Sequence, residues 1–220
     1  MVNLRDAIRL IVITDEELAV PRKVQAVVED ALRGGAKAVQ LRDKRASAQK
    51  LLAQALALRE LTRDWGALLF LNDRFDVALA AEADGVHLGP DDLPVEAVRK
   101  SAPMGFLIGA STDDPEMARR VEAAGADYIG CGAVFPTSTK KDAGEVIGVE
   151  GLARVVDAVQ IPVVGIGGVT PAGARRIAEE SGAAGVAVIG AVMAAADPEA
   201  MARRLLGVFP EGPGSPRRPG

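Results

Sequence analysis

The sequence predicts an α/β fold in which eight parallel strands and their intervening helices close into a single-domain (β/α)8 TIM barrel. Three observations predict it: short apolar runs alternate with longer amphipathic stretches, a Gly/Ala-rich junction returns before several of these runs, and no change in composition divides the 220 residues. Because only 3% of the residues are aromatic, Val, Leu, Ile and Ala must build the core, which favours buried parallel strands. An open doubly wound sheet is the alternative fold.

The elements follow from these patterns in chain order. Strands are expected at residues 10–14, 38–42, 68–72, 85–88, 106–110, 128–131, 163–166 and 185–189. Helices are expected at residues 21–33, 47–63, 95–101, 115–124, 151–159, 171–181 and 198–208. Prolines 21, 115, 171 and 198 stand at or near helix starts, where a missing N–H costs little. Residues 1–208 are assigned to the barrel catalytic domain, and residues 209–220, rich in Pro and Gly, to a disordered C-terminal tail.

Composition and charge exclude several classes of protein. The formal net charge of −4 offers no basic field for nucleic acid, and no apolar run is long enough to span a bilayer or form a signal peptide. One cysteine, Cys131, permits no internal disulfide, which favours a cytoplasmic protein. The lone histidine, His87, argues against Ser-His-Asp chemistry, and we interpret it as a structural residue at a strand end. The oligomeric state stays open, a homo-oligomer included.

One group of candidate site residues follows the second expected strand. In a barrel of this class the catalytic groups lie at the carboxyl ends of the strands and on the loops that follow. Gln40, Arg42 and Lys44 alternate, so they can face one side of an extended segment and converge on the barrel mouth. The donor fork of Arg and the point charge of Lys together suit a multiply charged phosphate. A buried amide with two surface cations is the other reading of this segment.

Carboxylates follow the third and fourth strands. Asp73 comes directly after the third strand, and the adjacent Asp91 and Asp92 follow the fourth. Few hard oxygen ligands beside phosphate-binding cations suit Mg²⁺, which takes one or two carboxylates together with substrate phosphate oxygens. Helix capping is the alternative role for each aspartate. The spacing from Asp73 favours Asp92 over Asp91 as the second ligand.

A second anionic site is expected on the later strands. Ser111 and Thr112 follow the fifth strand, where they could cap a helix or contact a ligand. The longest loop, residues 132–144, is rich in hydroxyl groups and lysine, and Gly167, Gly168 and Gly190 follow strands seven and eight. Glycines there let backbone N–H groups approach a phosphate. The inventory fits an enzyme that joins two phosphorylated small molecules.

Five linked motifs also resemble thiamine phosphate synthase, in order from residue 10 to about residue 193. They are Gln40-Leu41-Arg42-Asp43-Lys44, Leu71-Asn72-Asp73-Arg74 with Asp76, Ala83-Asp84-Gly85-Val86-His87-Leu88-Gly89, Pro136-Thr137-Ser138-Thr139-Lys140-Lys141 and Gly165-Ile166-Gly167-Gly168. The resemblance implies that 4-amino-2-methyl-5-(diphosphooxymethyl)pyrimidine is joined to thiazole phosphate, giving thiamine phosphate and pyrophosphate. It also implies a dissociative course, in which pyrophosphate leaves before the thiazole nitrogen attacks. Ile11, Pro90, Asp113 and Gly190 depart from the family pattern.

The resemblance also implies residue roles. Gln40, Arg42, Lys44 and Asn72 would hold the pyrimidine diphosphate together with Ser111, and Asp73 and Asp92 would bind Mg²⁺. Thr137 and Thr139 would contact the thiazole phosphate, Lys140 would lie beside the leaving group, and the backbone at Gly168, Ile189 and Gly190 would complete the phosphate cradle. Leu41, Asp43 and Ser138 are assigned to substrate binding with their segments, and Lys140, Arg42 and Ser111 are the catalytic candidates.

Three alternatives remain at this point. A thiazole tautomerase would bind the thiazole phosphate without coupling it, but that group tends to lack the complete diphosphate-binding set. A non-catalytic barrel that binds a phosphorylated ligand would not need a pair of magnesium ligands. A Schiff-base aldolase using Lys44 or Lys140 is disfavoured, because both lysines fall on loops rather than inside strands.

Overall fold

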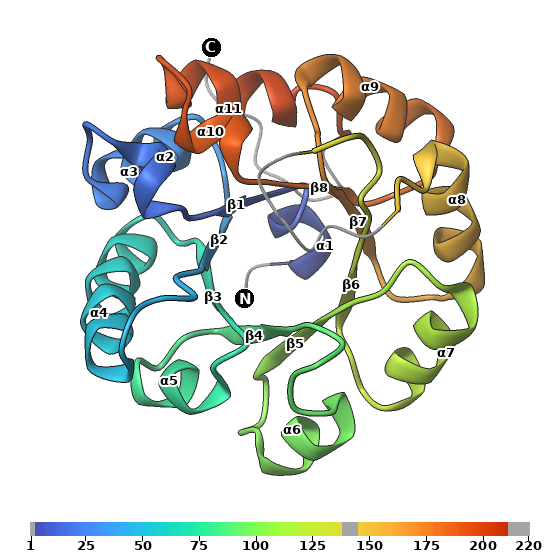
Figure 1. Ribbon diagram of the computed structural model, residues 1–220, viewed down its shortest axis with the longest axis horizontal. Helices are drawn as coiled ribbons and strands as arrows, with labels where there is room; N and C mark the ends of the chain where they lie inside the picture. The colour runs from blue at the N-terminus through green and yellow to red at the C-terminus, as the bar shows by residue number, and fades with distance from the viewer. Residues whose placement is uncertain (1–2, 138–144, 211–220) are drawn as a thin grey trace.

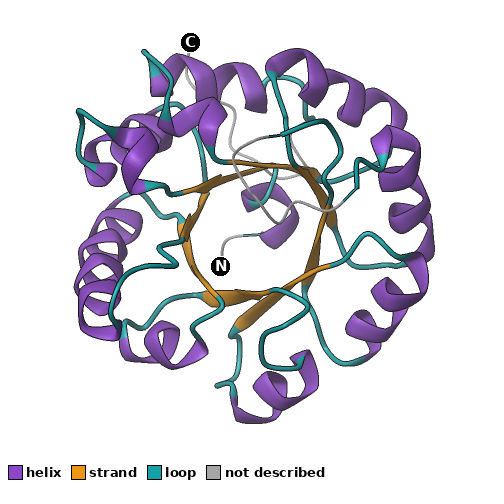
Figure 2. Cartoon of the chain, in the orientation of Figure 1, coloured by secondary structure: helices purple, strands orange, loops and turns teal. Residues whose placement is uncertain are grey.

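The computed structural model describes residues 3–137 and 145–210 of the chain. Eight strands form one closed parallel barrel, in which β8 pairs back with β1, and helices surround it, so the predicted single-domain TIM barrel is confirmed (Figures 1 and 2). Each strand begins and ends within one residue of its predicted range. The strands are β1 (Leu10–Ile13), β2 (Ala38–Leu41), β3 (Leu68–Asn72), β4 (Gly85–Leu88), β5 (Leu107–Ser111), β6 (Tyr128–Cys131), β7 (Val163–Ile166) and β8 (Gly185–Val188).

The predicted helices also form, because their amphipathic patterns are joined to good first turns. The side chains of Ser47, Asp114, Thr170 and Asp197 each accept a backbone N–H at a helix start, and Pro115, Pro171 and Pro198 occupy the first helical positions. These helices are α3 (Val24–Arg33), α4 (Ala48–Asp64), α6 (Val95–Ser101), α7 (Pro115–Ala123), α8 (Gly148–Ala158), α9 (Pro171–Glu180) and α11 (Pro198–Leu206).

Within residues 3–137 and 145–210, the structure adds four short helices that the sequence did not predict. They are α1 (Leu4–Ala7), α2 (Glu16–Ala19), α5 (Phe75–Ala80) and α10 (Gly190–Met193). Four to six residues make too few turns for a 3.6-residue apolar period to be recognised. The prediction that Pro21 starts a helix was wrong, because Pro21 lies in a turn and α3 begins at Val24.

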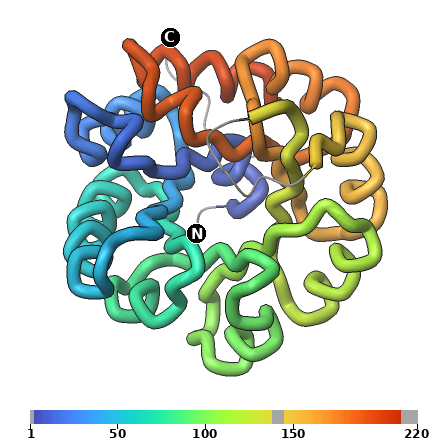
Figure 3. Tube along the Cα trace, viewed as in Figure 1, coloured from blue at the N-terminus to red at the C-terminus, as the bar shows by residue number. Residues whose placement is uncertain are grey.

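The two ends of the described chain close the outer ring of helices. Figure 3 shows the first helices beside the last ones, and α11 packs against α3. The approach is close: a Cβ added to Gly34 would lie 2.8 Å from the Cβ of Ala202. Phe209, the first residue assigned to the tail, is buried, and its carbonyl accepts a hydrogen bond from Arg9 Nη1 at 3.2 Å. The packed barrel therefore extends to Phe209, and residues 211–220 lie outside the described part.

Opposite ends of the barrel are closed differently. The short helix α1 precedes β1 and lies within the ring of strands, at their amino ends (Figure 1). The loops that follow the strands surround the carboxyl ends, where the large pocket lies. Within the described residues, no helix combines the length and apolar character that a membrane crossing requires.

Candidate active site

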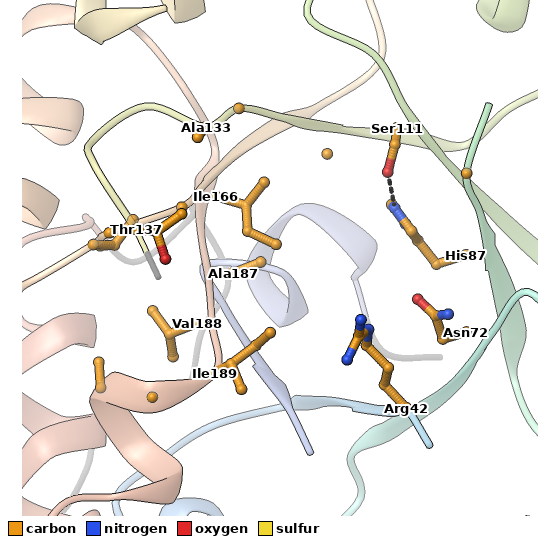
Figure 4. A pocket seen from close by; sticks show the side chains of 18 of the residues that line it. Arg42, Asn72, His87, Ser111, Ala133, Thr137, Ile166, Ala187, Val188 and Ile189 are labelled. Atoms are coloured by element: carbon orange, nitrogen blue, oxygen red, sulfur yellow. Dashed lines mark hydrogen bonds between the residues drawn. The ribbon is translucent and has the colours of Figure 1, made fainter. Parts of the chain in front are cut away.

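A pocket of about 720 Å³ opens at the carboxyl ends of the strands. Its lining comes from the ends of β2 to β8 and the loops after them, which is where barrels of this class carry their catalytic groups. Its size is typical of a site for small organic ligands. Figure 4 shows Arg42, Asn72, His87 and Ser111 on one side of this pocket and Thr137, Val188 and Ile189 on the other.

The cationic part of the pocket follows β2. Arg42 and Lys44 both line the pocket, as the sequence predicted. The backbone of Arg42 is fixed by Thr14, whose Oγ1 accepts the Arg42 N–H at 3.0 Å, while the Thr14 N–H donates to the Gln40 carbonyl at 2.9 Å. The Arg42 Nε is buried and has no hydrogen-bond partner among the described residues. A buried donor without a partner is costly, so this guanidinium is suited to an anionic ligand.

The acidic part of the pocket brings together the two predicted metal ligands. Asp73 and Asp92 interact through their side chains, and Asp92 Oδ2 accepts the Gly89 N–H at 2.7 Å. Burial, first, and the neighbouring Asp92 carboxylate, second, together raise the pKa of Asp73 to about 6, against the opposing effect of Lys44 and Arg42. Asp91 also lines the pocket but is exposed. The geometry therefore pairs Asp73 with Asp92, the residue that the spacing had favoured.

Two carboxylates that repel each other in a half-buried pocket fit a divalent cation. Among the described residues there is no cluster of three or more His, Cys, Asp or Glu side chains that could hold a metal alone. Mg²⁺ does not need one, because it usually retains waters and binds through one or two carboxylates and substrate phosphate oxygens. The hard oxygens of Asp73 and Asp92, beside two cations, match that chemistry.

Ser111 ends β5 and lies in the pocket, with His87 of β4 beside it. His87 Nε2 and Ser111 Oγ are 2.8 Å apart, and the dashed line in Figure 4 marks this hydrogen bond. His87, predicted to be a structural residue at a strand end, also lines the pocket. A sequence signal could have found it: His87 is a polar residue between the apolar Val86 and Leu88, and alternate side chains of a strand face opposite sides. In the structure, Val86 and Leu88 are fully buried and His87 is half-buried.

The opposite rim of the pocket is built mainly from backbone and small or apolar side chains. Gly167 and Gly168 have φ values of 96° and 62°, a region that favours glycine. A Cβ on Gly168 would lie 2.8 Å from the Phe135 carbonyl oxygen, so this position also requires a close backbone approach. The short helix α10 begins at Gly190, directly after Ile189, and both residues line the pocket with Thr137. Ser138, Thr139 and Lys140 lie outside the described residues.

Three predicted substrate-binding residues do not reach the pocket with their side chains. Leu41 is buried in the core between strand and helices, and Gln40 lies beneath the pocket and hydrogen-bonds Tyr128. Asp43 turns outward, where its Oδ1 accepts the N–H groups of Arg45 and Ala46 and its Oδ2 accepts Gln54 Nε2 at 3.2 Å. Leu41 and Asp43 face outward, as the predicted alternation of residues 40, 42 and 44 implies, whereas Gln40 faces inward but lies too deep in the barrel to reach the pocket.

The fold and pocket define a class: a (β/α)8-barrel enzyme whose site combines cations, paired carboxylates and a glycine-rich rim. The family model of thiamine monophosphate synthase matches residues 10–192. The chain belongs to this family, as the motifs predicted, and is a transferase of thiamine biosynthesis.

Individual relatives agree with the family assignment. The chain is 48% identical over 206 residues to the thiamine-phosphate synthase of Archaeoglobus fulgidus, covering 94% of this chain and 95% of the relative. It is 50% identical over 195 residues to that of Pyrococcus furiosus, covering 89% and 91%. A solved thiamine phosphate pyrophosphorylase from Pyrococcus furiosus superimposes with a TM-score of 0.85 at 46% identity, covering 94% of this chain and 97% of that structure.

Proposed function

We propose that this enzyme couples 4-amino-2-methyl-5-(diphosphooxymethyl)pyrimidine to thiazole phosphate. The bond between the pyrimidine methylene carbon and the diphosphate oxygen breaks first, and its electron pair leaves with pyrophosphate. The thiazole nitrogen then donates its lone pair to the methylene carbon, which gives thiamine phosphate. The family assignment and the placement of opposite charges in one corner of the pocket support this reaction.

The observation that carries the proposal is the juxtaposition of two cations with a carboxylate pair. Arg42 and Lys44 lower the pKa of Asp73, while burial and Asp92 raise it more strongly, so all four side chains share one electrostatic environment. A diphosphate with a divalent cation satisfies both charge sets at once, because phosphate oxygens pair with the guanidinium and ammonium groups and the metal pairs with the carboxylates. A single carboxylate ligand would leave part of this charge unmatched.

Asp73 and Asp92 would hold Mg²⁺, which when bound neutralises negative charge that develops on the leaving diphosphate. Arg42 and Lys44 bind the same group from the β2 loop, and Asn72 adds an amide at the end of β3. These groups already line the pocket in the structure, so they can stabilise the separating charge with little reorganisation.

The thiazole phosphate is assigned to the opposite rim. Thr137 offers a hydroxyl group, and Gly168, Ile189 and Gly190 place backbone close to the pocket. A short extra helix after the eighth strand, here α10, recurs in the phosphate sites of barrels. Thr139, Ser138 and Lys140 belong to this proposal on the sequence motif alone.

The reaction needs no protein nucleophile, and the surroundings of Cys131 and His87 agree with this. Cys131 is fully buried in β6, as predicted, and burial raises the pKa of its thiol to about 12. His87 is held between Tyr128 and Ser111 by hydrogen bonds of 3.0 and 2.8 Å. Leaving-group electrostatics therefore carry the chemistry.

A two-substrate assay of the full chain tests the proposal. We expect pyrophosphate release only when both substrates and Mg²⁺ are present, and its loss in excess chelator. Product formed equally well in chelator would refute the magnesium role. Isomerisation of the thiazole without pyrophosphate release would identify a tautomerase, and binding of either phosphate without turnover would identify a ligand-binding barrel.

A further inference from the structure

A chain of polar side chains runs from the barrel interior to the pocket. Gln40 of β2 hydrogen-bonds the phenol of Tyr128 on β6, the Tyr128 hydroxyl lies 3.0 Å from His87 Nδ1, and His87 Nε2 lies 2.8 Å from Ser111 Oγ. Gln40 is only 3% exposed and Tyr128 is fully buried. Polar groups buried in this way are expensive unless their hydrogen bonds are satisfied, so the order of donors and acceptors along the chain is constrained.

Glycines on the neighbouring strands provide space for this series of hydrogen-bonded side chains. Gly109 of β5 pairs with His87 on one side and Tyr128 on the other. A Cβ at Gly109 would overlap the Tyr128 ring and lie 2.5 Å from His87 Nδ1, and a Cβ at Gly130 would lie 3.0 Å from His87 Cε1. The Phe70 ring packs edge-on against Tyr128 at 5.3 Å. The histidine and tyrosine are therefore held in one arrangement from several sides.

The direction of the hydrogen bonds follows from the Tyr128–His87 contact, in which 3.0 Å separates the phenol oxygen from Nδ1. Burial raises the pKa of Tyr128 strongly, so the phenol keeps its proton, and a phenol O–H is a better donor than a neutral imidazole N–H, while the imidazole nitrogen is the better acceptor. The Tyr128 proton is then available to His87 Nδ1, and a neutral imidazole that accepts at Nδ1 carries its own proton on Nε2. His87 Nε2–H donates to Ser111 Oγ, which leaves the Ser111 proton to point elsewhere.

We propose that His87 and Tyr128 are positioning residues that hold the Ser111 hydroxyl group as a hydrogen-bond donor toward an anionic oxygen of the pyrimidine diphosphate substrate. The identity of the substrate in this inference rests on the proposed function, whereas the direction of the hydrogen bonds from Tyr128 to Ser111 does not. A serine hydroxyl alone rotates freely between donor and acceptor roles. An N–H of His87 that occupies one lone pair of this oxygen prevents Ser111 from donating to His87, so the hydroxyl proton is left for the pocket, which favours an anion over a cation.

The orientation can be measured without any substrate, because the chain has one histidine and one tyrosine. In ¹⁵N-histidine-labelled full-length protein at pH 8, we expect the imidazole nitrogen resonances of the Nε2–H tautomer. Tyr128→Phe, which removes the donor to Nδ1, should shift the population toward the Nδ1–H tautomer. An Nδ1–H tautomer in the unmodified protein would overturn the proposal.

Kinetics then test the consequence for the substrate. Ser111→Ala and Tyr128→Phe should each raise KM for the pyrimidine diphosphate by about tenfold, the effect of one hydrogen bond to a charged group, with KM for thiazole phosphate unchanged. Tyr128→Phe should add nothing in the Ser111→Ala background, because both act through the same hydroxyl. His87→Gln, whose amide can still donate toward Ser111, should retain more affinity than His87→Ala.

Phe70→Leu is the matched control, because it disturbs the packing against Tyr128 and leaves every hydrogen bond of the chain in place. It should lower Tm without changing KM for the pyrimidine diphosphate selectively. Additive losses in the double variant, or an equal KM effect in Phe70→Leu, would show that Tyr128 acts only through packing and overturn the proposal. Absence of all turnover, with the Nε2–H tautomer observed, would instead refute the proposed function.

Discussion

The two sides of the pocket differ in how they are built. On the side of β2 to β5, ionised and polar side chains define the site, among them Arg42, Asp73, Asp92 and Ser111. On the side of β6 to β8, glycines, Ile166, Ala187, Val188 and Ile189 form most of the lining. A side-chain site can hold a metal and a multiply charged group, whereas a backbone site can approach one phosphate closely and leave apolar surface for a ring.

This contrast indicates where sensitivity to mutation should lie. On the charged side, one substitution removes a charge from a coupled group of four, because Asp73 interacts with Asp92, Lys44 and Arg42 together. On the backbone side, a side-chain substitution removes little, and only the addition of atoms where backbones nearly touch should have an effect. The proposed division of the two substrates between the sides makes this contrast measurable.

The largest effect is expected from Asp73→Asn. This substitution keeps the size of the side chain and removes a metal ligand, so turnover should fall by about 1,000-fold, equivalent to several kcal/mol of lost charge stabilisation. Asp91→Asn is the control, since Asp91 lies on the same loop as Asp92 but is exposed. Steady-state pyrophosphate release measures both. Equal losses in the two variants would contradict the Asp73–Asp92 pairing as the metal site.

A second large effect is expected at Arg42. Removing its guanidinium in Arg42→Ala should lower kcat/KM for the pyrimidine diphosphate by about 100-fold, and Arg42→Lys should recover only part because an ammonium lacks the planar donor fork. Arg45→Ala removes a neighbouring arginine whose exposed side chain pairs with Glu17, and should change kcat/KM little. If Arg45→Ala matches Arg42→Ala, the effect comes from general surface charge and not from the pocket.

An intermediate effect on the other side is expected from Gly168→Ala. The added Cβ would overlap the Pro136 carbonyl oxygen at a φ of 62°, so the 135–136 backbone must shift. We expect KM for thiazole phosphate to rise by about tenfold while KM for the pyrimidine diphosphate stays the same. Gly66→Ala carries similar backbone strain, with a φ of 58° and no atom within 4 Å of the Cβ, and should cost stability only. A rise in both KM values in Gly168→Ala would contradict the proposed assignment of one substrate to each side of the pocket.

The fold was readable from the sequence because the strands are short, mainly apolar runs, several of them preceded by a glycine turn, and because several of the helices have a recognisable first turn. Pro115, Pro171 and Pro198 marked three helix starts correctly, since each combines with an N-cap side chain just before it. Pro21 lacks such a cap at its own position, and the helix starts three residues later at Val24. Local signals therefore succeeded where two of them coincide.

The site was only partly readable, for a physical reason visible at β2. Alternation along β2 and the turn that follows it predicted correctly that Arg42 and Lys44 share one side, but it gives no depth, and Gln40 lies beneath the pocket against Tyr128. Asp43 is drawn outward by the N–H groups of that turn. His87 was underestimated because its value depends on Tyr128 and Ser111, which are 41 and 24 residues away in the chain.

The smallest effect expected is a gain in stability, and it occurs on the charged side. The pKa of Asp73 is raised from 3.8 to about 6 in the folded protein, so its contribution to stability is fully present below pH 3.8 and is lost as the pH rises through 6. Above pH 6, the metal-free protein holds a carboxylate that would be more stable in the unfolded chain. Asp73→Asn should therefore stabilise the metal-free protein at pH 8 by about 1 kcal/mol, after allowance for solvent screening of this half-buried group.

Asparagine suits this position in a second respect, because Asp73 has a φ of 65° and asparagine tolerates the left-handed region. Urea unfolding of the metal-free protein at pH 8 and pH 5 measures the effect, and the gain should be about half as large at pH 5, which lies between the unfolded and folded pKa values of Asp73. Asp91→Asn should show no such pH dependence. Addition of Mg²⁺ with inorganic pyrophosphate should reverse the order, stabilising the unmodified protein and not Asp73→Asn. A gain of equal size at both pH values would assign the effect to the backbone conformation of residue 73. It would contradict the electrostatic destabilisation that we expect on the charged side of the pocket and not on the other.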